Sequence, residues 1–107
     1  MEPEALEMKE AIGTVLSLKN VPAKGATALI PVPPLADPDD FVELRINAKA
    51  VGPAQSPGPD IGGYYELLIP RTALLDNLGA GRTFDYIYWA GGTNEITSKP
   101  VQYDITH

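Results

Sequence analysis

The chain has 107 residues and a formal net charge of -6, with 10 glycines, 11 prolines, one histidine and no cysteine. The lack of cysteine excludes disulfides, thiolate metal sites and a thiol nucleophile, and the lone His107 disfavours a Ser-His-Asp triad or a multi-histidine metal site. The acidic balance disfavours nucleic-acid binding, and no apolar run approaches the roughly 20 residues of a membrane helix. An ordinary apolar content of 44% combined with many turn-forming residues favours an all-β sandwich or barrel.

The first eleven residues are acidic, with Glu2, Glu4, Glu7 and Glu10 against Lys9. They carry no convincing helix cap or apolar stripe, so we predict a flexible lead-in or linker over 1–11 and one β domain over 12–107. The chain starts without the basic and apolar segments of a signal peptide. Two interpretations stay open: a complete cytoplasmic protein, or a domain of a longer chain whose targeting signal lies elsewhere.

Alternating apolar and polar residues predict six strands, with the clearest period of two in the third of them. These strands are expected at residues 12–19, 26–32, 41–48, 64–69, 83–90 and 101–106. The proline- and glycine-rich residues 49–63 form a long connection that could hold a seventh strand. Gly91, Gly92 and the residues after them have the chemistry of a hairpin turn.

A short helical turn is expected over 72–78, because Leu74, Leu75 and Leu78 share one helical face. Thr72 is its expected N-cap, and Gly79 follows its end. The inward positions of all these elements define the expected core. It holds Leu16 or Leu18, Leu29, Val42, Leu44, Ile46, Tyr65, Leu67, Ile69, Leu75, Tyr86, Tyr88, Val101, Tyr103 and Ile105.

The order of these pieces from Gly13 to Thr106 resembles a known family of domains. The matching segments are a leading strand and turn at 13–20, a strand ending in proline at 27–33, an acidic turn and strand at 40–46, an Ile-Pro step at 69–71, a Tyr-bearing strand ending in glycines at 86–92, and Ser98-Lys99-Pro100 before the last strand. Together they are similar to the immunoglobulin-like repeats found in tandem in large surface and secreted proteins of Gram-negative bacteria. The acidic lead-in and the proline-rich loop at 52–63 depart from that pattern.

The resemblance implies an immunoglobulin-like β-sandwich with Greek-key connections, six or seven strands and one short helical turn. It implies a non-catalytic structural or adhesive module of a larger bacterial surface or secreted protein, extracellular or at the cell surface, with neighbouring domains or another protein as partners. No cofactor and no catalytic residue comes with it. The alternative is a standalone small binding protein, an inhibitor or accessory subunit, that would be cytoplasmic. Prolines near strand ends disfavour extended edge pairing, so the isolated domain is expected to be a monomer.

The candidate binding residues are Tyr64 and Trp89. Tyr64 and Tyr65 face opposite sides of one strand, so one is core and the other could contact a partner. Trp89 lies on the opposite face from Tyr86 and Tyr88, and alternation alone leaves open which face is buried. Either of those two tyrosines could form a tyrosine corner with the backbone of the loop preceding its strand.

The acidic residues invite two further hypotheses. The turn with Asp37, Asp39 and Asp40 could ligate calcium, but it lacks the spacing of an EF-hand, and a solvated acidic turn is the favoured interpretation. Pairs of strand carboxylates could serve glycoside chemistry, but alternation places them on a solvated face. These carboxylates are Glu43, Glu66 and Asp85. We therefore expect neither a metal site nor an enzyme.

Overall fold

The computed structural model describes residues 3–34 and 36–107, and its elements are almost all strands. In chain order they are β1 (Glu7–Met8), β2 (Val15–Ser17), the 3₁₀ turn η1 (Leu18–Asn20), β3 (Ala26–Pro31), β4 (Phe41–Ile46), β5 (Lys49–Ala50), β6 (Tyr64–Ile69), α1 (Arg71–Leu75), β7 (Gly79–Ala90), β8 (Asn94–Thr97) and β9 (Val101–Thr106). None of the helices in the described part of the chain is long and apolar enough to cross a bilayer.

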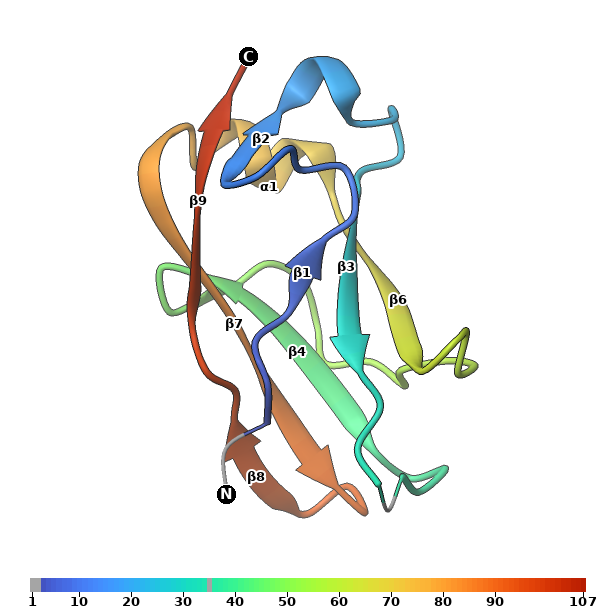
Figure 1. Ribbon diagram of the computed structural model, residues 1–107. Helices are drawn as coiled ribbons and strands as arrows, with labels where there is room; N and C mark the ends of the chain where they lie inside the picture. The colour runs from blue at the N-terminus through green and yellow to red at the C-terminus, as the bar shows by residue number, and fades with distance from the viewer. Residues whose placement is uncertain (1–2, 35) are drawn as a thin grey trace.

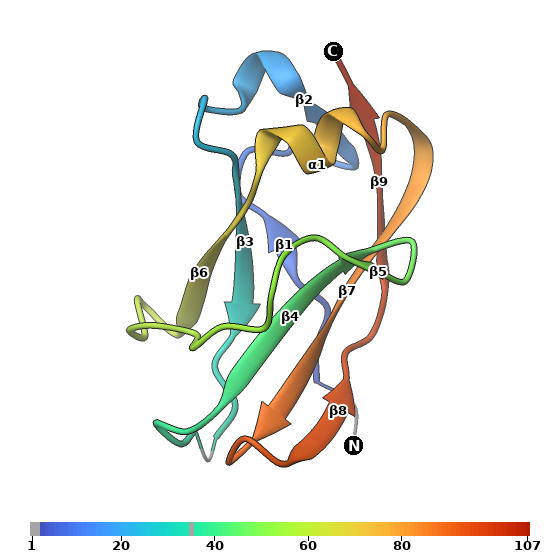
Figure 2. The ribbon, with the colours of Figure 1, turned by 180° about the vertical axis from the view of Figure 1, so that it is seen from behind.

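The strands form two sheets (Figures 1 and 2). One sheet has the order β1-β3-β6, and the other has the order β2-β9-β7-β4-β5, with β8 paired to β7 next to β9. All of these pairs are antiparallel except β2 with β9, which run parallel. The expected all-β class and two-sheet arrangement are confirmed.

The core lies between the sheets and follows the period of two. In β4, β6 and β7, alternate side chains are buried, because one face of each sheet packs on the other sheet. The sequence left open whether Leu16 or Leu18 is buried, and in the structure both side chains are buried. Phe84, absent from the expected core, is 0% exposed and packs its ring edge to face with Tyr103 at a centroid distance of 5.5 Å.

The prediction that Leu29 and Leu75 lie in the core is wrong. In β3 the buried side chains are Ala26, Ala28 and Ile30, so Leu29 lies on the opposite face and is only partly buried. Leu29 shares its face with Thr27 and Pro31, and the small alanines of the other set gave only a weak signal for the buried face. In α1, Leu74 is buried and Leu75 is 40% exposed.

The short helix is present but begins and ends earlier than expected. It covers Arg71–Leu75, with Pro70 at its N-cap and no side-chain cap, so Thr72 does not cap it. Gly79 is not the residue after the helix, because Asp76 is its C-cap and Gly79 begins β7. The chain therefore turns from one sheet into the other within a few residues.

The start of the chain differs from the expected flexible lead-in over 1–11, of which residues 1 and 2 lie outside the described residues. Leu6 and Met8 are each 2% exposed and belong to the core. Glu7 and Met8 form β1 against β3, and a Glu10 carboxylate oxygen accepts a hydrogen bond of 2.8 Å from the Thr27 amide. This segment is a packed part of the domain because its two buried apolar side chains complete the core.

Two turns need unusual backbone. Gly25 has φ +129°, and a Cβ there would lie 2.3 Å from the carbonyl oxygen of Ile69, so only glycine fits before β3. The turn between β4 and β5 places Asn47 at φ 51° and Ala48 at φ 65°. Positive φ at both central residues is the geometry of a tight type I′ hairpin, in which an alanine is uncommon. The long connection after β4 thus does hold a short strand, β5.

The domain is elongated, and its chain enters and leaves at opposite ends. Its Cα extents are 37 × 24 × 23 Å. The first described residues lie at the lower end in Figure 1 and the C-terminus at the upper end, and the reverse view agrees (Figure 2).

Candidate functional site

The sequence-predicted binding residues, Tyr64 and Trp89, lie on different sheets. Tyr64 begins β6, is 38% exposed and pairs with Pro31 of β3. Trp89 lies on the outer face of β7, partly buried between Phe41 of β4 and Glu95 of β8. The two side chains do not share one surface, so each remains a separate prediction.

The strand carboxylates do not form a pair across a cleft. Glu66 is on β6 of one sheet, while Glu43 and Asp85 are on β4 and β7 of the other. The Arg45 guanidinium donates two hydrogen bonds to the Asp85 carboxylate, 2.8 Å from Nε to Oδ1 and 2.6 Å from Nη2 to Oδ2. The bonds to this carboxylate raise the pKa of Arg45. Asp85 therefore serves a bidentate ion pair on the sheet surface.

The acidic turn holds a buried carboxylate. Asp40 is 1% exposed, and its Oδ2 accepts from the Tyr88 hydroxyl at 2.5 Å and from the Asp37 amide at 3.0 Å. Its Oδ1 accepts from the Gly91 amide at 2.7 Å. Burial acts to raise the pKa of Asp40, but these three hydrogen bonds outweigh it and lower the pKa below its usual value. Asp40 thus ties the turn before β4 to the end of β7.

Nor do the described residues group as a metal centre. Asp37 Oδ1 accepts from the Asp39 amide at 2.8 Å, as in a local turn. Among residues 3–34 and 36–107, no cluster of three or more His, Asp or Glu side chains could hold a metal ion. The geometry of the acidic turn is that of a loop fastened to the sandwich.

Tyrosine hydroxyls from the second sheet hold the N-terminal segment. The Tyr86 hydroxyl donates to the Glu4 carbonyl oxygen at 2.7 Å, and the Tyr103 hydroxyl accepts from the Met8 amide at 3.1 Å. Burial, with a smaller contribution from the Glu4 charge, raises the pKa of Tyr86 to about 12. For Tyr88, burial and the bond to Asp40 also raise the pKa. The Tyr86 and Tyr88 hydroxyls therefore stay protonated near neutral pH.

Neither Tyr86 nor Tyr88 forms the tyrosine corner that the sequence left open for them. In that motif the hydroxyl bonds backbone of the loop just upstream of its own strand. Tyr86 instead reaches Glu4, 82 residues away, and Tyr88 reaches the carboxylate of Asp40, 48 residues away. The sequence identified these tyrosines as important but gave no signal for partners so distant.

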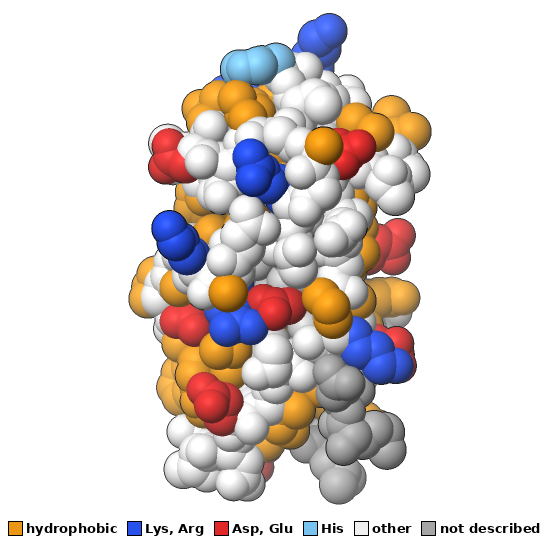
Figure 3. All heavy atoms as spheres, turned by 90° about the vertical axis from the view of Figure 1, so that its left-hand side faces the viewer, with side chains coloured by type: hydrophobic (Ala, Val, Ile, Leu, Met, Phe, Trp, Pro, Cys, Tyr) orange, Lys and Arg blue, Asp and Glu red, His pale blue; other side chains and the backbone are white. Residues whose placement is uncertain are grey.

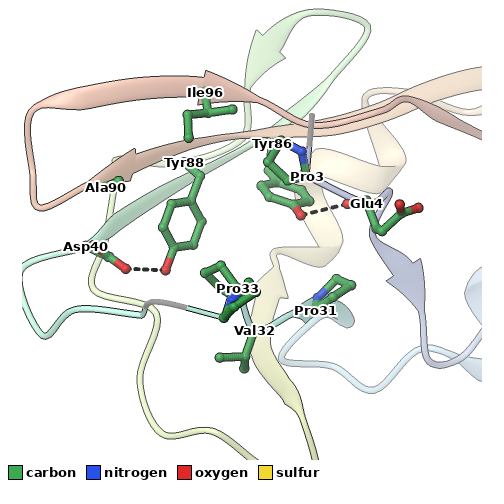
Figure 4. Close-up of a pocket in the computed structure, with 11 residues that line it drawn as sticks. Pro3, Glu4, Pro31, Val32, Pro33, Asp40, Tyr86, Tyr88, Ala90 and Ile96 are labelled. Atoms are coloured by element: carbon green, nitrogen blue, oxygen red, sulfur yellow. Dashed lines mark hydrogen bonds between the residues drawn. The ribbon is translucent and has the colours of Figure 1, made fainter. Parts of the chain in front are cut away.

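A pocket of about 430 Å³ opens at the lower end of the sandwich (Figure 4). Tyr86 and Tyr88 of β7 form its floor, residues 31–34 after β3 form one wall, and Ile96 of β8 forms another. Its lining is mostly apolar. Sequence reasoning missed this pocket, because its lining comes from segments far apart in the chain and no strand was expected at residues 94–97, although the hairpin turn before them was.

No family model, curated protein or solved structure gives a significant match to this chain. The geometry and the residues are therefore the basis of the functional interpretation. The pocket and the two ends of the domain are the features from which a function can be argued.

Proposed function

We propose that this domain is a non-catalytic immunoglobulin-like module that acts as a spacer, and as a site of adhesion, within a larger bacterial surface or secreted protein. The bacterial and extracellular setting comes from the resemblance of the sequence. The spacer role is supported by the path of the chain through the domain.

The strand order supports the immunoglobulin-like assignment. β1, β3 and β6 correspond to strands A, B and E, and β9, β7, β4 and β5 to G, F, C and C′. The first strand is split between the sheets, because β1 pairs with β3 whereas β2 runs parallel to β9. The connections from β3 to β4, from β5 to β6 and from β6 to β7 each pass between sheets, as a Greek key requires.

The placement of the two ends carries the spacer proposal. The N-terminal segment starts at one end of the 37 Å axis, and β9 leaves at the other (Figure 1). Domains linked in series through such ends extend along one line. Each added module then lengthens the chain by about its long axis, whereas modules with adjacent termini would fold side by side.

A fusion of two copies, joined directly from His107 to Met1, tests the spacer role by small-angle X-ray scattering. We expect a maximum dimension near twice that of the single domain, whose long axis is 37 Å. A fusion through a long Gly/Ser linker is the control, since a flexible chain gives a broad distribution of distances. A compact direct fusion, folded back on itself, would contradict the proposal.

One observation favours the alternative of a small binding protein, namely the apolar pocket above Tyr86 and Tyr88. Clefts with an apolar lining and a few polar groups are the usual form of binding sites. A module can also carry such a pocket, so the two hypotheses differ in whether the domain belongs to a longer chain.

A further inference from the structure

The sandwich is open along one side, and this opening exposes part of its core face. Ile96 pairs with Tyr88, which is 4% exposed, so both side chains point to the inner face of the sheet. Ile96 is nevertheless 36% exposed. No described residue covers the Ile96 side chain. Residues 31–34 lie on the opposite side of the pocket of about 430 Å³ and do not pack against Ile96 (Figure 4).

The edge of β8 beside this opening has backbone groups with no strand partner among the described residues. The Ser98 amide donates to the Tyr86 carbonyl at 2.9 Å, so residue 98 points its backbone toward β7. Alternation then directs the N–H and C=O groups of Glu95 and Thr97 away from β7. Among the described residues no strand pairs with β8 on that side. Two outward-facing positions of β8 therefore have no strand partner within residues 3–34 and 36–107, and backbone groups at such an edge can pair with an added chain.

The same edge already pairs with the N-terminal segment just beyond β8, at Lys99. The Lys99 amide donates to the Pro3 carbonyl oxygen at 3.0 Å. The segment that follows Pro3 continues upward to β1 (Figure 1), in the direction of β9. A strand laid beside Glu95 and Thr97 would extend this line over the mouth of the pocket.

The charge around the opening determines which charge a bound strand should carry. Asp37 and Asp39 are exposed in the turn fastened by Asp40, and Glu4 is exposed at the other end of the pocket. Glu4 and Lys99 offset each other in an ion pair, with 3.2 Å between Nζ and Oε1, so the negative charge at the opening comes from Asp37 and Asp39. With a net charge of -6, the domain favours a cationic segment and disfavours an anionic one.

We propose that the groove between β8 and residues 31–34 binds an extended peptide segment of a partner protein, one that pairs with the edge of β8, inserts an apolar side chain over Tyr86 and Tyr88, and carries lysine or arginine at its outward positions. Backbone pairing supplies the affinity in this mode, and the pocket supplies the specificity. The site is a property of the single domain and holds whether or not that domain is a spacer.

The test is an NMR titration of the isotope-labelled domain with the capped peptide Lys-Val-Lys-Leu-Lys-Val-Lys. Chemical-shift changes are expected at residues 31–34, 86–90 and 94–97. The capped peptide Glu-Val-Glu-Leu-Glu-Val-Glu is the charge control, and its binding is expected to be at least about tenfold weaker.

Two variants separate edge pairing from pocket filling. Thr97→Pro removes an amide that points away from β7, so no internal ladder bond is lost, while pairing with a peptide is blocked. Ile96→Lys places a charge at the mouth of the pocket. Each variant should weaken the lysine peptide by about tenfold or more. Leu68→Lys, at a 44% exposed position on the edge strand β6, makes the same change elsewhere and should leave the affinity unchanged.

The proposal is overturned by any of three results. These are an absence of shifts with the lysine peptide, shifts centred on β6 instead of β8, or equal binding of the lysine and glutamate peptides. Retained affinity in a folded Thr97→Pro or Ile96→Lys domain also contradicts it, and the dispersion of each variant's own spectrum reports whether it is folded.

Discussion

Asp40 is a carboxylate that is 1% exposed, and only its hydrogen-bond donors make that burial tolerable. The Tyr88 hydroxyl and the amides of Gly91 and Asp37 supply three of them. Because the pKa of Asp40 is lowered in the folded state, the unfolded chain takes up a proton first when the pH falls. The stability that the charge contributes is thus present above the unfolded pKa of about 4 and is lost as the pH falls through the folded pKa.

Asp40→Asn should therefore destabilise the domain by about 2 kcal/mol at neutral pH, because an amide nitrogen would face a donor and the charge-assisted bonds are lost. The difference from the wild type should shrink below about pH 4. Urea unfolding of both proteins at neutral pH and near pH 3 measures it. Asp39→Asn, at an exposed position of the same turn, is the matched control. An equal cost in the control, or a difference that does not change with pH, would show that the buried charge is not responsible.

Single residues also show where prediction from the sequence stops. The inward set of β4 was correct because Glu43 and Arg45 mark the other face as polar. In β3 the one polar residue, Thr27, does mark the face of Leu29, but the larger apolar side chain of Leu29 outweighed it, and Leu29 was placed in the core that Ala28 occupies. The β5 hairpin was missed as a turn because Ala48 adopts φ 65°, a conformation for which glycine or asparagine is the usual signal.

At the scale of elements, the strands with alternating pattern were predictable and the short ones were not. β6 and β9 were expected at residues 64–69 and 101–106, which are the bounds that the structure has. β1 contains two residues, too few to show a period, and it is held by tertiary contacts such as the bond from Met8 to Tyr103. The pocket shares this tertiary origin, since its lining joins segments far apart in the chain and depends on how β8 pairs with β7.

The hold of the second sheet on β1 can be tested with Tyr103→Phe. This change leaves the buried Met8 amide without its acceptor, at a cost of about 1–3 kcal/mol. Hydrogen exchange should accelerate most at Met8 and its neighbours, above any change shared by β4 and β7, because the lost bond acts locally. Tyr64→Phe, at an exposed tyrosine of β6, is the control and should leave the exchange pattern intact. Hydrogen exchange that accelerates equally in all strands would contradict a local role of the Tyr103 hydroxyl in holding β1.

At the scale of the whole molecule, the domain presents a mixed surface and two separated ends. On the face that corresponds to the left-hand side of Figure 1, acidic and basic side chains are interspersed, with apolar side chains between them (Figure 3). Such a face carries no large field of one sign. The placement of the ends along the 37 Å axis suits a domain joined to others in series.

The central claim, that the domain is one module of a larger surface or secreted protein, is tested most directly by the mass of the protein that carries it in its native source. An antibody raised against the domain would be used on whole cells and on cells stripped of surface protein. We predict a band far above 11.5 kDa that is lost on stripping. A band at 11.5 kDa that remains inside the cells would contradict the claim and favour a small standalone binding protein.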